Sequence, residues 1–246
     1  PSEQNWPSYY ESEDYISHTD GKRSLFEKVY HFIKSIALKN KLNLINSLQT
    51  SKGTLLDSGA GTGGFLSVAK KDSWQCVGVE PNKKAKDIAL KKGVAFVENT
   101  SDLDDASIDV ITMWHVLEHV PDVEKQIVEL NRLLKPGGTI LIAVPNFNSF
   151  DAKYYGAFWA AYDVPRHLWH FSKTAIQSLF KKEGLQLIKV LPMKFDSFYV
   201  SLLSEKYKSG RMNFLKAFYI GLKSNWVGNQ KMEYSSHIYV IKNHKN

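Results

Sequence analysis

The chain has 246 residues, 43% of them hydrophobic, and a formal net charge of +7 at pH 7. This length and composition can bury a full core and fit one large α/β domain, and the lack of any run of about 18 apolar residues argues against a membrane span. The single cysteine, Cys76, excludes an internal disulfide framework and a cysteine-based zinc site, so the cytoplasm is the default location.

The first residues contain no initiator Met, no basic region and no apolar stretch. We therefore expect a trimmed or processed chain, with something missing upstream, rather than a signal peptide. The positive charge invites a nucleic-acid partner, but the lysines are dispersed over the outer faces of predicted helices. This distribution favours solubility over phosphate binding.

Two segments come before the first predicted strand. Residues 1–20 are polar and rich in Tyr, Ser and acids, which is typical of an arm or a loose helix. Between residues 22 and 49, apolar residues recur at helical spacing and predict a pair of amphipathic helices. We take residues 1–49 as an N-terminal arm with helices, and 50–246 as the main domain.

From residue 50 onward, short apolar strands alternate with amphipathic helices. This alternation predicts a parallel sheet covered on both faces, with right-handed connections. Two late strands predict a closing antiparallel hairpin. The predicted strands are 53–59, 75–80, 94–99, 107–116, 139–145, 185–192 and 235–242, and the predicted helices are 63–72, 82–93, 122–138, 172–184 and most of 195–233.

The loop after the first strand reads "LLDSGAGTGGFL", residues 55–66. Gly59, Gly61 and Gly64 satisfy the dinucleotide pattern G-x-G-x-x-G, in which glycines let the backbone approach a ligand closely. Asp57, just before them, would place negative charge where a pyrophosphate must bind. The acid suits a ligand with a cationic sulfonium and an ammonium group instead.

A second acid, Glu80, ends the second predicted strand. A carboxylate there can accept hydrogen bonds from both ribose hydroxyls of a nucleoside. This feature alone fits a nicotinamide dinucleotide equally well. The alternative interpretation is an exposed carboxylate beside a helix start.

The segments "LLDSGAGTGGF", "VGVEP", "SIDVITMWHVLEHVPD" and "LNRLLKPGGTILIAVPN" together resemble the successive motifs of class I S-adenosylmethionine-dependent methyltransferases. The resemblance covers about residues 50–190, and "DVPRHLWHFS" is similar to the stretch after strand five in the ubiquinone-biosynthesis-like group. It implies a Rossmann-like α/β fold with seven strands in the order 3-2-1-4-5-7-6, the last antiparallel, with helices on both faces and helical cap insertions.

The resemblance also implies an S-adenosylmethionine site. Asp57 and the glycines match the motif around the methionine part, and Glu80 matches the ribose acid. The usual Gly-Asp pair near the adenine is replaced here by Glu98 and Asn99, and "TMWH" would lie over the methyl end. The cofactor-binding residues implied are Asp57, Gly59, Ala60, Gly61, Gly63, Glu80, Pro81, Asn99, Thr100, Ser101, Trp114 and His115. We expect no metal.

Candidate catalytic residues follow strands four and five. His115 could act as a general base through a neutral imidazole, or form a polar pocket wall. His167 and Arg166 in "DVPRH" are the other candidates, Arg166 either as a clamp for a carboxylate or phosphate or as an ion-pair partner of Asp163 or Asp151. His119 and Glu118 are expected to be structural.

Three further segments bear on the acceptor. The aromatic-rich segment 145–171 is either a hydrophobic substrate wall or the packing of a cap helix. The N-terminal arm could close over the cofactor with Tyr15 or His18 touching it, or stay disordered. Residues 211–226, within the helical insertion 195–233, are basic and amphipathic, and could lie on a membrane or form a cap or dimer helix.

The sequence thus favours a methyltransferase that acts on a small molecule, aromatic, sugar-like or lipid-like, most simply at a hydroxyl oxygen. RNA or protein methylation is the alternative, although the Asn/Asp-Pro-Pro-aromatic turn of base-amine methylation is absent and Cys76 lies on the wrong strand for cytosine C5 chemistry. A nicotinamide enzyme could use the same glycine loop, and a non-catalytic S-adenosylmethionine-binding domain could have the same cofactor site. The acceptor and the oligomeric state are left open.

Overall fold

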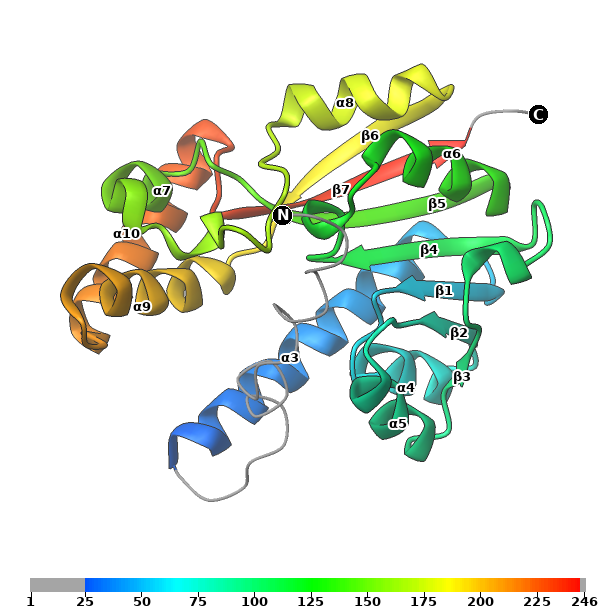
Figure 1. Ribbon diagram of the computed structural model, residues 1–246, viewed down its shortest axis with the longest axis horizontal. Helices are drawn as coiled ribbons and strands as arrows, with labels where there is room; N and C mark the ends of the chain where they lie inside the picture. Colours follow the sequence, from blue (N-terminus) through cyan, green and yellow to red (C-terminus); the bar gives the residue numbers. More distant parts are fainter. Residues whose placement is uncertain (1–24, 244–246) are drawn as a thin grey trace. The chain divides into compact units, whose positions relative to one another are not determined.

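The computed structural model describes residues 25–243 and contains a seven-stranded sheet of order β3-β2-β1-β4-β5-β7-β6 (Figure 1). This order confirms the predicted fold. The strands are β1 Thr54–Ser58, β2 Gln75–Val79, β3 Ala95–Phe96, β4 Ile108–Trp114, β5 Leu134–Pro145, β6 Leu185–Pro192 and β7 Ser236–Asn243. The α-helices are α3 Leu25–Leu48, α4 Gly64–Lys71, α5 Lys83–Lys91, α6 Val123–Leu133, α7 Phe150–Tyr155, α8 Lys173–Lys182, α9 Asp196–Ser209 and α10 Phe214–Lys231.

The expected arm of residues 1–20, with Tyr15 and His18, lies outside the described residues. The described chain divides into two compact units. The first contains residues up to Thr112 together with Leu133–Gly138, and the second contains Met113–Arg132 and Thr139 onward.

In the first unit, β1 pairs in parallel with β2 on one side and with β4 on the other. Leu55 and Leu56 of β1 are fully buried, as expected for a strand covered on both faces. The register places Asp57 opposite Gly78 of β2 and Thr112 of β4. The end of β1 is therefore flanked by both neighbouring strands.

The predicted helix pair between residues 22 and 49 is wrong, because the structure has one continuous helix, α3. No glycine or proline interrupts Leu25–Leu48, so nothing in the sequence breaks the helix. Helix α3 packs against α4. Phe32 and Ile33, which contributed to the apolar pattern, are exposed.

Strand β3 is shorter than the predicted 94–99. After the Val97 N–H donates to the Gly78 carbonyl at 3.1 Å, the chain turns into a 3₁₀ helix at Thr100–Asp102. The Asp102 carboxylate accepts the Asn99 N–H at 3.1 Å, so the polar run "NTSD" satisfies its own backbone and ends the strand.

In the second unit, β7 pairs antiparallel with both β5 and β6, which confirms the predicted hairpin. Ser172 caps α8, its hydroxyl accepting the Ala175 N–H at 3.2 Å. The helical insertion predicted at 195–233 is the pair α9 and α10, which pack against each other and against α7.

A buried carboxylate organises this helical part. Asp151 of α7 is fully buried and accepts hydrogen bonds from Trp159 Nε1 at 2.8 Å, Ser224 Oγ at 2.5 Å and Ser235 Oγ at 2.7 Å. Its donors come from a loop, from α10 and from the residue before β7. Because all three groups donate to the Asp151 carboxylate, this acid has a structural role and is not the ion-pair partner of Arg166.

Candidate active site

The loop after β1 adopts the left-handed backbone that its glycines permit. Gly59, Gly61 and Gly63 have φ values of 73°, 53° and 68°, whereas Gly64 is already the first residue of α4. The third glycine with positive φ in this loop is therefore Gly63, and not Gly64, which completes the dinucleotide pattern. Among the described residues, no atom lies within 4 Å of a Cβ built at Gly61, so open space faces the middle of the loop.

Glu80, just after β2, joins this loop. Its carboxylate accepts the Gly61 N–H at 2.7 Å and the Asn82 N–H at 2.9 Å, and burial raises its pKa although both hydrogen bonds lower it. Each carboxylate oxygen still has a second lone pair. The glycine loop and Glu80 are thus already hydrogen-bonded to each other without a ligand.

Asp57 is the most buried acid of this loop, with 3% of its surface exposed. Burial raises its pKa to about 7, although the Thr112 hydroxyl donates to it at 2.6 Å and Lys41 also lowers the pKa. One hydrogen bond does not replace the water that the carboxylate has lost. Asp57 is therefore a site that favours an added positive charge.

The remaining predicted cofactor residues follow other strands. Pro81 lies between Glu80 and the Asn82 that caps α5, and Asn99 and Ser101 lie exposed at the 3₁₀ turn after β3, with Thr100 between them. Trp114 ends β4 and belongs to the second unit, as does His115.

His115 differs from its expected state. It has a left-handed backbone, φ 58°, and a side chain that is one-third exposed between two carboxylates. Asp196 Oδ2 lies 2.9 Å from its Nε2, and Glu118 Oε1 lies 3.3 Å from its Nδ1. Burial alone would lower the pKa of His115, but the two carboxylates raise it to about 10. A neutral imidazole at pH 7 is expected from the sequence, whereas these two carboxylates favour the protonated ring.

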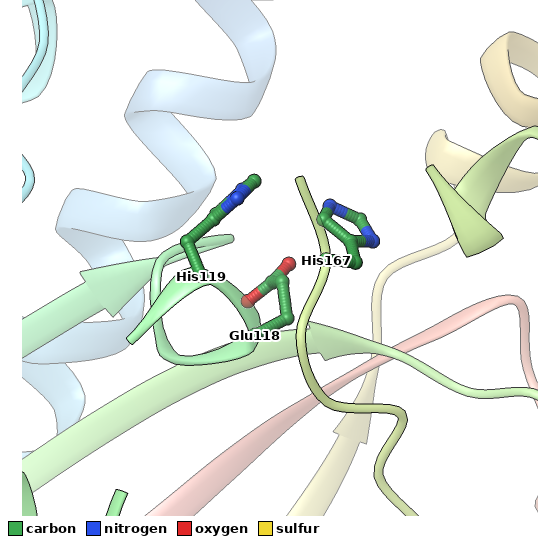
Figure 2. Close-up of side chains that lie close together, drawn as sticks. All are labelled: Glu118, His119 and His167. Atoms are coloured by element: carbon green, nitrogen blue, oxygen red, sulfur yellow. The ribbon is translucent and has the colours of Figure 1, made fainter. Parts of the chain in front are cut away.

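Glu118, His119 and His167 converge in the second unit (Figure 2). Each offers a possible ligand atom, and these atoms lie within 4.8 Å of one another. The two imidazole centroids are 4.6 Å apart in an edge-to-face arrangement, and burial lowers the pKa of His167. The segment after strand five thus contacts the turn after strand four, where the Glu118 carbonyl accepts the Leu168 N–H at 2.8 Å.

Arg166 forms an ion pair with Asp163, Nη2 to Oδ1, at 2.6 Å. This is one of the two ion-pair partners considered from the sequence. The aromatic segment is largely core: Tyr155 and Trp159 are buried with Val200 and Ile220, and Phe147, Phe150 and Tyr162 pack against them. Tyr154, Phe158 and Trp169 remain exposed.

Two polar partners were not predicted from the sequence. Thr112, which donates to Asp57, could have been found, because the predicted strand order already puts strands one and four side by side. Asp196, which pairs with His115, gives no local signal, since it is the first residue of a helix far along the chain.

Comparison with known proteins identifies this arrangement. A family model described as a methyltransferase domain matches residues 27–190. The chain belongs to this family. It is a class I S-adenosylmethionine-dependent methyltransferase, and S-adenosylmethionine is its cofactor.

Curated relatives include the ubiquinone biosynthesis O-methyltransferases of Serratia proteamaculans, 32% identical over 45% of this chain and 52% of the relative, and of Alkalilimnicola ehrlichii, 28% identical over 49% and 52%. The chain therefore spans about half the length of these relatives.

Solved structures share the fold. One is a Thermotoga maritima methyltransferase described as a "possible histamine N-methyltransferase", with 20% identity, TM-score 0.63 and coverage of 98% of this chain and 99% of that one. Another is the geranyl diphosphate C-methyltransferase of Streptomyces coelicolor, with 16% identity, TM-score 0.62 and coverage of 99% and 97%.

The residues of this methyltransferase loop fit the cofactor. A buried, under-solvated Asp57 suits the cationic methionine end, Glu80 retains lone pairs for hydroxyl donors, and the space at Gly61 admits a ligand against the backbone. When bound, S-adenosylmethionine supplies an activated methyl group on a neutral leaving sulfur.

Asp57→Asn should separate stability from cofactor binding. Because the pKa of Asp57 is raised from 3.8 to about 7, ionising it opposes folding increasingly between pH 4 and 7. The amide removes that cost, so the unliganded variant should be more stable at pH 7.5 by on the order of 3 kcal/mol in urea unfolding. Its affinity for S-adenosylmethionine should fall roughly 10–100-fold by calorimetry, because a charged contact is lost.

The wild-type protein and Asp57→Asn should also differ in how their affinity for S-adenosylmethionine depends on pH. Wild-type affinity should rise as pH increases from 6.0 to 7.5, by up to about tenfold, as Asp57 ionises, while the cofactor's amine stays mostly protonated. The Asp57→Asn affinity should be flat over this range. An equal slope in both proteins would show that another group governs binding.

Proposed function

We propose that this methyltransferase transfers the methyl group to a hydroxyl oxygen of a small-molecule acceptor. The observation that carries the proposal is the cluster of Glu118, His119 and His167, because a hydroxyl acceptor arrives protonated and needs a group that takes its proton. Curated relatives named as O-methyltransferases support oxygen as the methylated atom. Because one structural neighbour is a C-methyltransferase, methylation at carbon is the alternative to be tested.

We assign the proton-accepting role to His167 rather than to His115. The Ala161 carbonyl lies 2.8 Å from His167 Nδ1 and can only accept, so Nδ1 carries the hydrogen and, in the neutral ring, Nε2 carries the lone pair. His115 keeps its proton, so its role in catalysis would be that of a hydrogen-bond donor and fixed positive charge. Arg166 is retained as a candidate clamp that would exchange Asp163 for an anionic acceptor.

The donor side follows from the first unit. Asp57 and Glu80 would hold the methionine and ribose parts, while Gly59, Ala60, Gly61 and Gly63 bring the backbone close. Pro81, Asn99, Thr100, Ser101 and Trp114 complete the proposed contacts. Displacement at the methyl carbon is in line, so the main task of these residues is to align donor and acceptor and to exclude water.

RNA and protein acceptors are less well supported. Burial raises the pKa of Cys76 to about 11, so this thiol stays protonated and does not serve as a nucleophile for cytosine C5. A small, apolar or aromatic acceptor suits the exposed Tyr154, Phe158 and Trp169. A cytoplasmic location is part of this proposal and rests on the single cysteine.

A screen for S-adenosylhomocysteine release over phenols, sugars, lipids, amines and RNA tests the acceptor class. Asp57→Asn, assayed at a donor concentration too low to saturate it, is the control with reduced donor binding. We expect turnover with hydroxyl compounds, and a deuterated methyl donor should label oxygen in the product. On the acceptor found, His167→Ala should lower kcat about 10²–10⁴-fold with little change in donor affinity, whereas His170→Ala should retain it. Turnover confined to amines or RNA would refute the assignment.

A further inference from the structure

We propose that Glu118, His119 and His167 bind a divalent cation of the zinc type. The three side chains come from the 3₁₀ turn Leu117–His119 and from the loop after η5 (Ala160–Tyr162), and their possible ligand atoms lie within 4.8 Å of one another (Figure 2). This proposal departs from the expectation of no metal given in the sequence analysis. No spacing rule could have predicted the site, because His167 is remote from the "LEH" turn in the sequence.

Backbone carbonyls orient both rings. The Arg166 carbonyl lies 3.1 Å from His119 Nδ1, and the Ala161 carbonyl lies 2.8 Å from His167 Nδ1. A carbonyl can only accept, so both Nδ1 atoms carry hydrogen, and each neutral ring has its lone pair on Nε2. Metal-binding histidines are commonly held in this way, with one ring nitrogen donating to a carbonyl and the other on the metal.

Glu118 supplies an independent observation. Its side chain is 1% exposed, and among the described residues its carboxylate has one polar side-chain partner, His115, whose Nδ1 lies 3.3 Å from Oε1. This contact leaves Oε2 to be compensated by another positive group. A buried carboxylate with so few partners is costly, and a cation between it and the two imidazoles would remove that cost.

The donor set selects the metal class. Two imidazole nitrogens and one carboxylate form the three-ligand set of catalytic zinc sites, which keep a further position open. Ligand atoms around tetrahedral zinc lie about 3.3 Å apart, so ligand atoms that now lie within 4.8 Å of one another would have to close by up to roughly 1.5 Å. The competing state is a proton on His167, whose Nε2 lies 3.8 Å from Asp163 Oδ2.

The open position would bind an acceptor oxygen and make its proton more acidic, taking over the role assigned above to His167 alone. This part rests on the proposed function, whereas cation binding does not. The binding test therefore uses the full chain without donor or acceptor.

The metal-stripped chain is titrated with Zn²⁺ by calorimetry and with Co²⁺ by visible absorption. We expect one bound equivalent and a cobalt spectrum of low coordination number. His167→Ala and Glu118→Gln should weaken binding at least about tenfold, and His170→Ala, a change in a neighbouring histidine outside the cluster, should not. Circular dichroism and thermal unfolding confirm that each variant folds.

Absence of stoichiometric binding to the wild-type chain would overturn the proposal, as would binding that both cluster variants retain. If Glu118→Gln does not fold, His167→Ala against His170→Ala decides the matter alone. Methyl transfer that proceeds undiminished in the metal-free enzyme would leave the binding site but remove its catalytic role.

A different observation carries a second inference. Helix α10 buries Ile220 together with the small residues Ala217, Gly221, Ser224 and Gly228, and exposes most of its other large apolar residues. A Cβ at Gly221 would lie 2.6 Å from the Phe198 ring. The exposed apolar side chains range from 48% to 86% accessible, and they are Phe214, Leu215, Phe218, Tyr219, Leu222 and Trp226. A water-facing helix surface has the opposite pattern, so this face has a partner.

The charge around this face identifies the partner. Residues 206–232 contain six cations and no acid, namely Lys206, Lys208, Arg211, Lys216, Lys223 and Lys231. A second copy of the same face would bring like charges together. No helix in the described part of the chain is long and apolar enough to cross a membrane. We infer that α10 lies on an anionic phospholipid surface, with its aromatic side chains in the headgroup boundary.

Flotation of the full chain with vesicles tests this inference. Binding should be weak with phosphatidylcholine alone, strong with roughly 30% phosphatidylserine, and reduced by salt. Trp226→Ser with Phe218→Ser should weaken it about tenfold or more, while Phe32→Ser, an exposed aromatic on α3, should not. Failure to bind anionic vesicles would overturn the inference, as would a dimer that dissociates in the α10 variant.

Discussion

A carboxylate held out of water at the end of β1 is the constraint on which the donor site depends. Within residues 25–243, Asp57 accepts one side-chain hydrogen bond, from Thr112, and burial disfavours its charged form. Burying this carboxylate therefore reduces the free energy of unfolding and creates a position where a cation is favoured. The glycine loop and Glu80, joined through the Gly61 N–H, keep the backbone in the left-handed form that leaves this position open.

Two other buried acids show how similar groups serve different purposes. Asp151 receives three hydrogen bonds from separate elements and holds the helical part together. Glu118 is equally buried, but in the described part of the chain it has only the ion pair with His115 on one side, with two imidazoles on the other. The three hydrogen bonds of Asp151 indicate a structural role. The shortage of partners around Glu118 indicates a functional one. Helix α10 also departs from the usual pattern of burial, because most of its large apolar side chains lie on its exposed face.

The residues of the proposed donor site could be named from the sequence because they lie in short local motifs. The alternating elements predict a parallel sheet, and the family resemblance implies its strand order. Parallel strands bring Asp57 and Glu80 to one edge, and positive φ explains Gly59, Gly61 and Gly63. The arrangement of the acceptor side could not be predicted, because its groups meet through long-range packing. The charge of His115 depends on Asp196, and the cluster around Glu118 depends on a loop that follows strand five. The undivided helix α3 shows that apolar spacing predicts a helix more reliably than it predicts where one ends.

The most direct measurement compares the affinity for S-adenosylmethionine of Gly61→Ala and Gly137→Ala at pH 7.5. Both glycines have positive φ, and no described atom lies within 4 Å of a Cβ placed at either one, so the backbone cost of each substitution is similar. The account predicts at least about tenfold weaker binding for Gly61→Ala alone, because the methyl group fills the space that the ligand needs. Equal affinities in the two variants would contradict a donor site in the loop after β1.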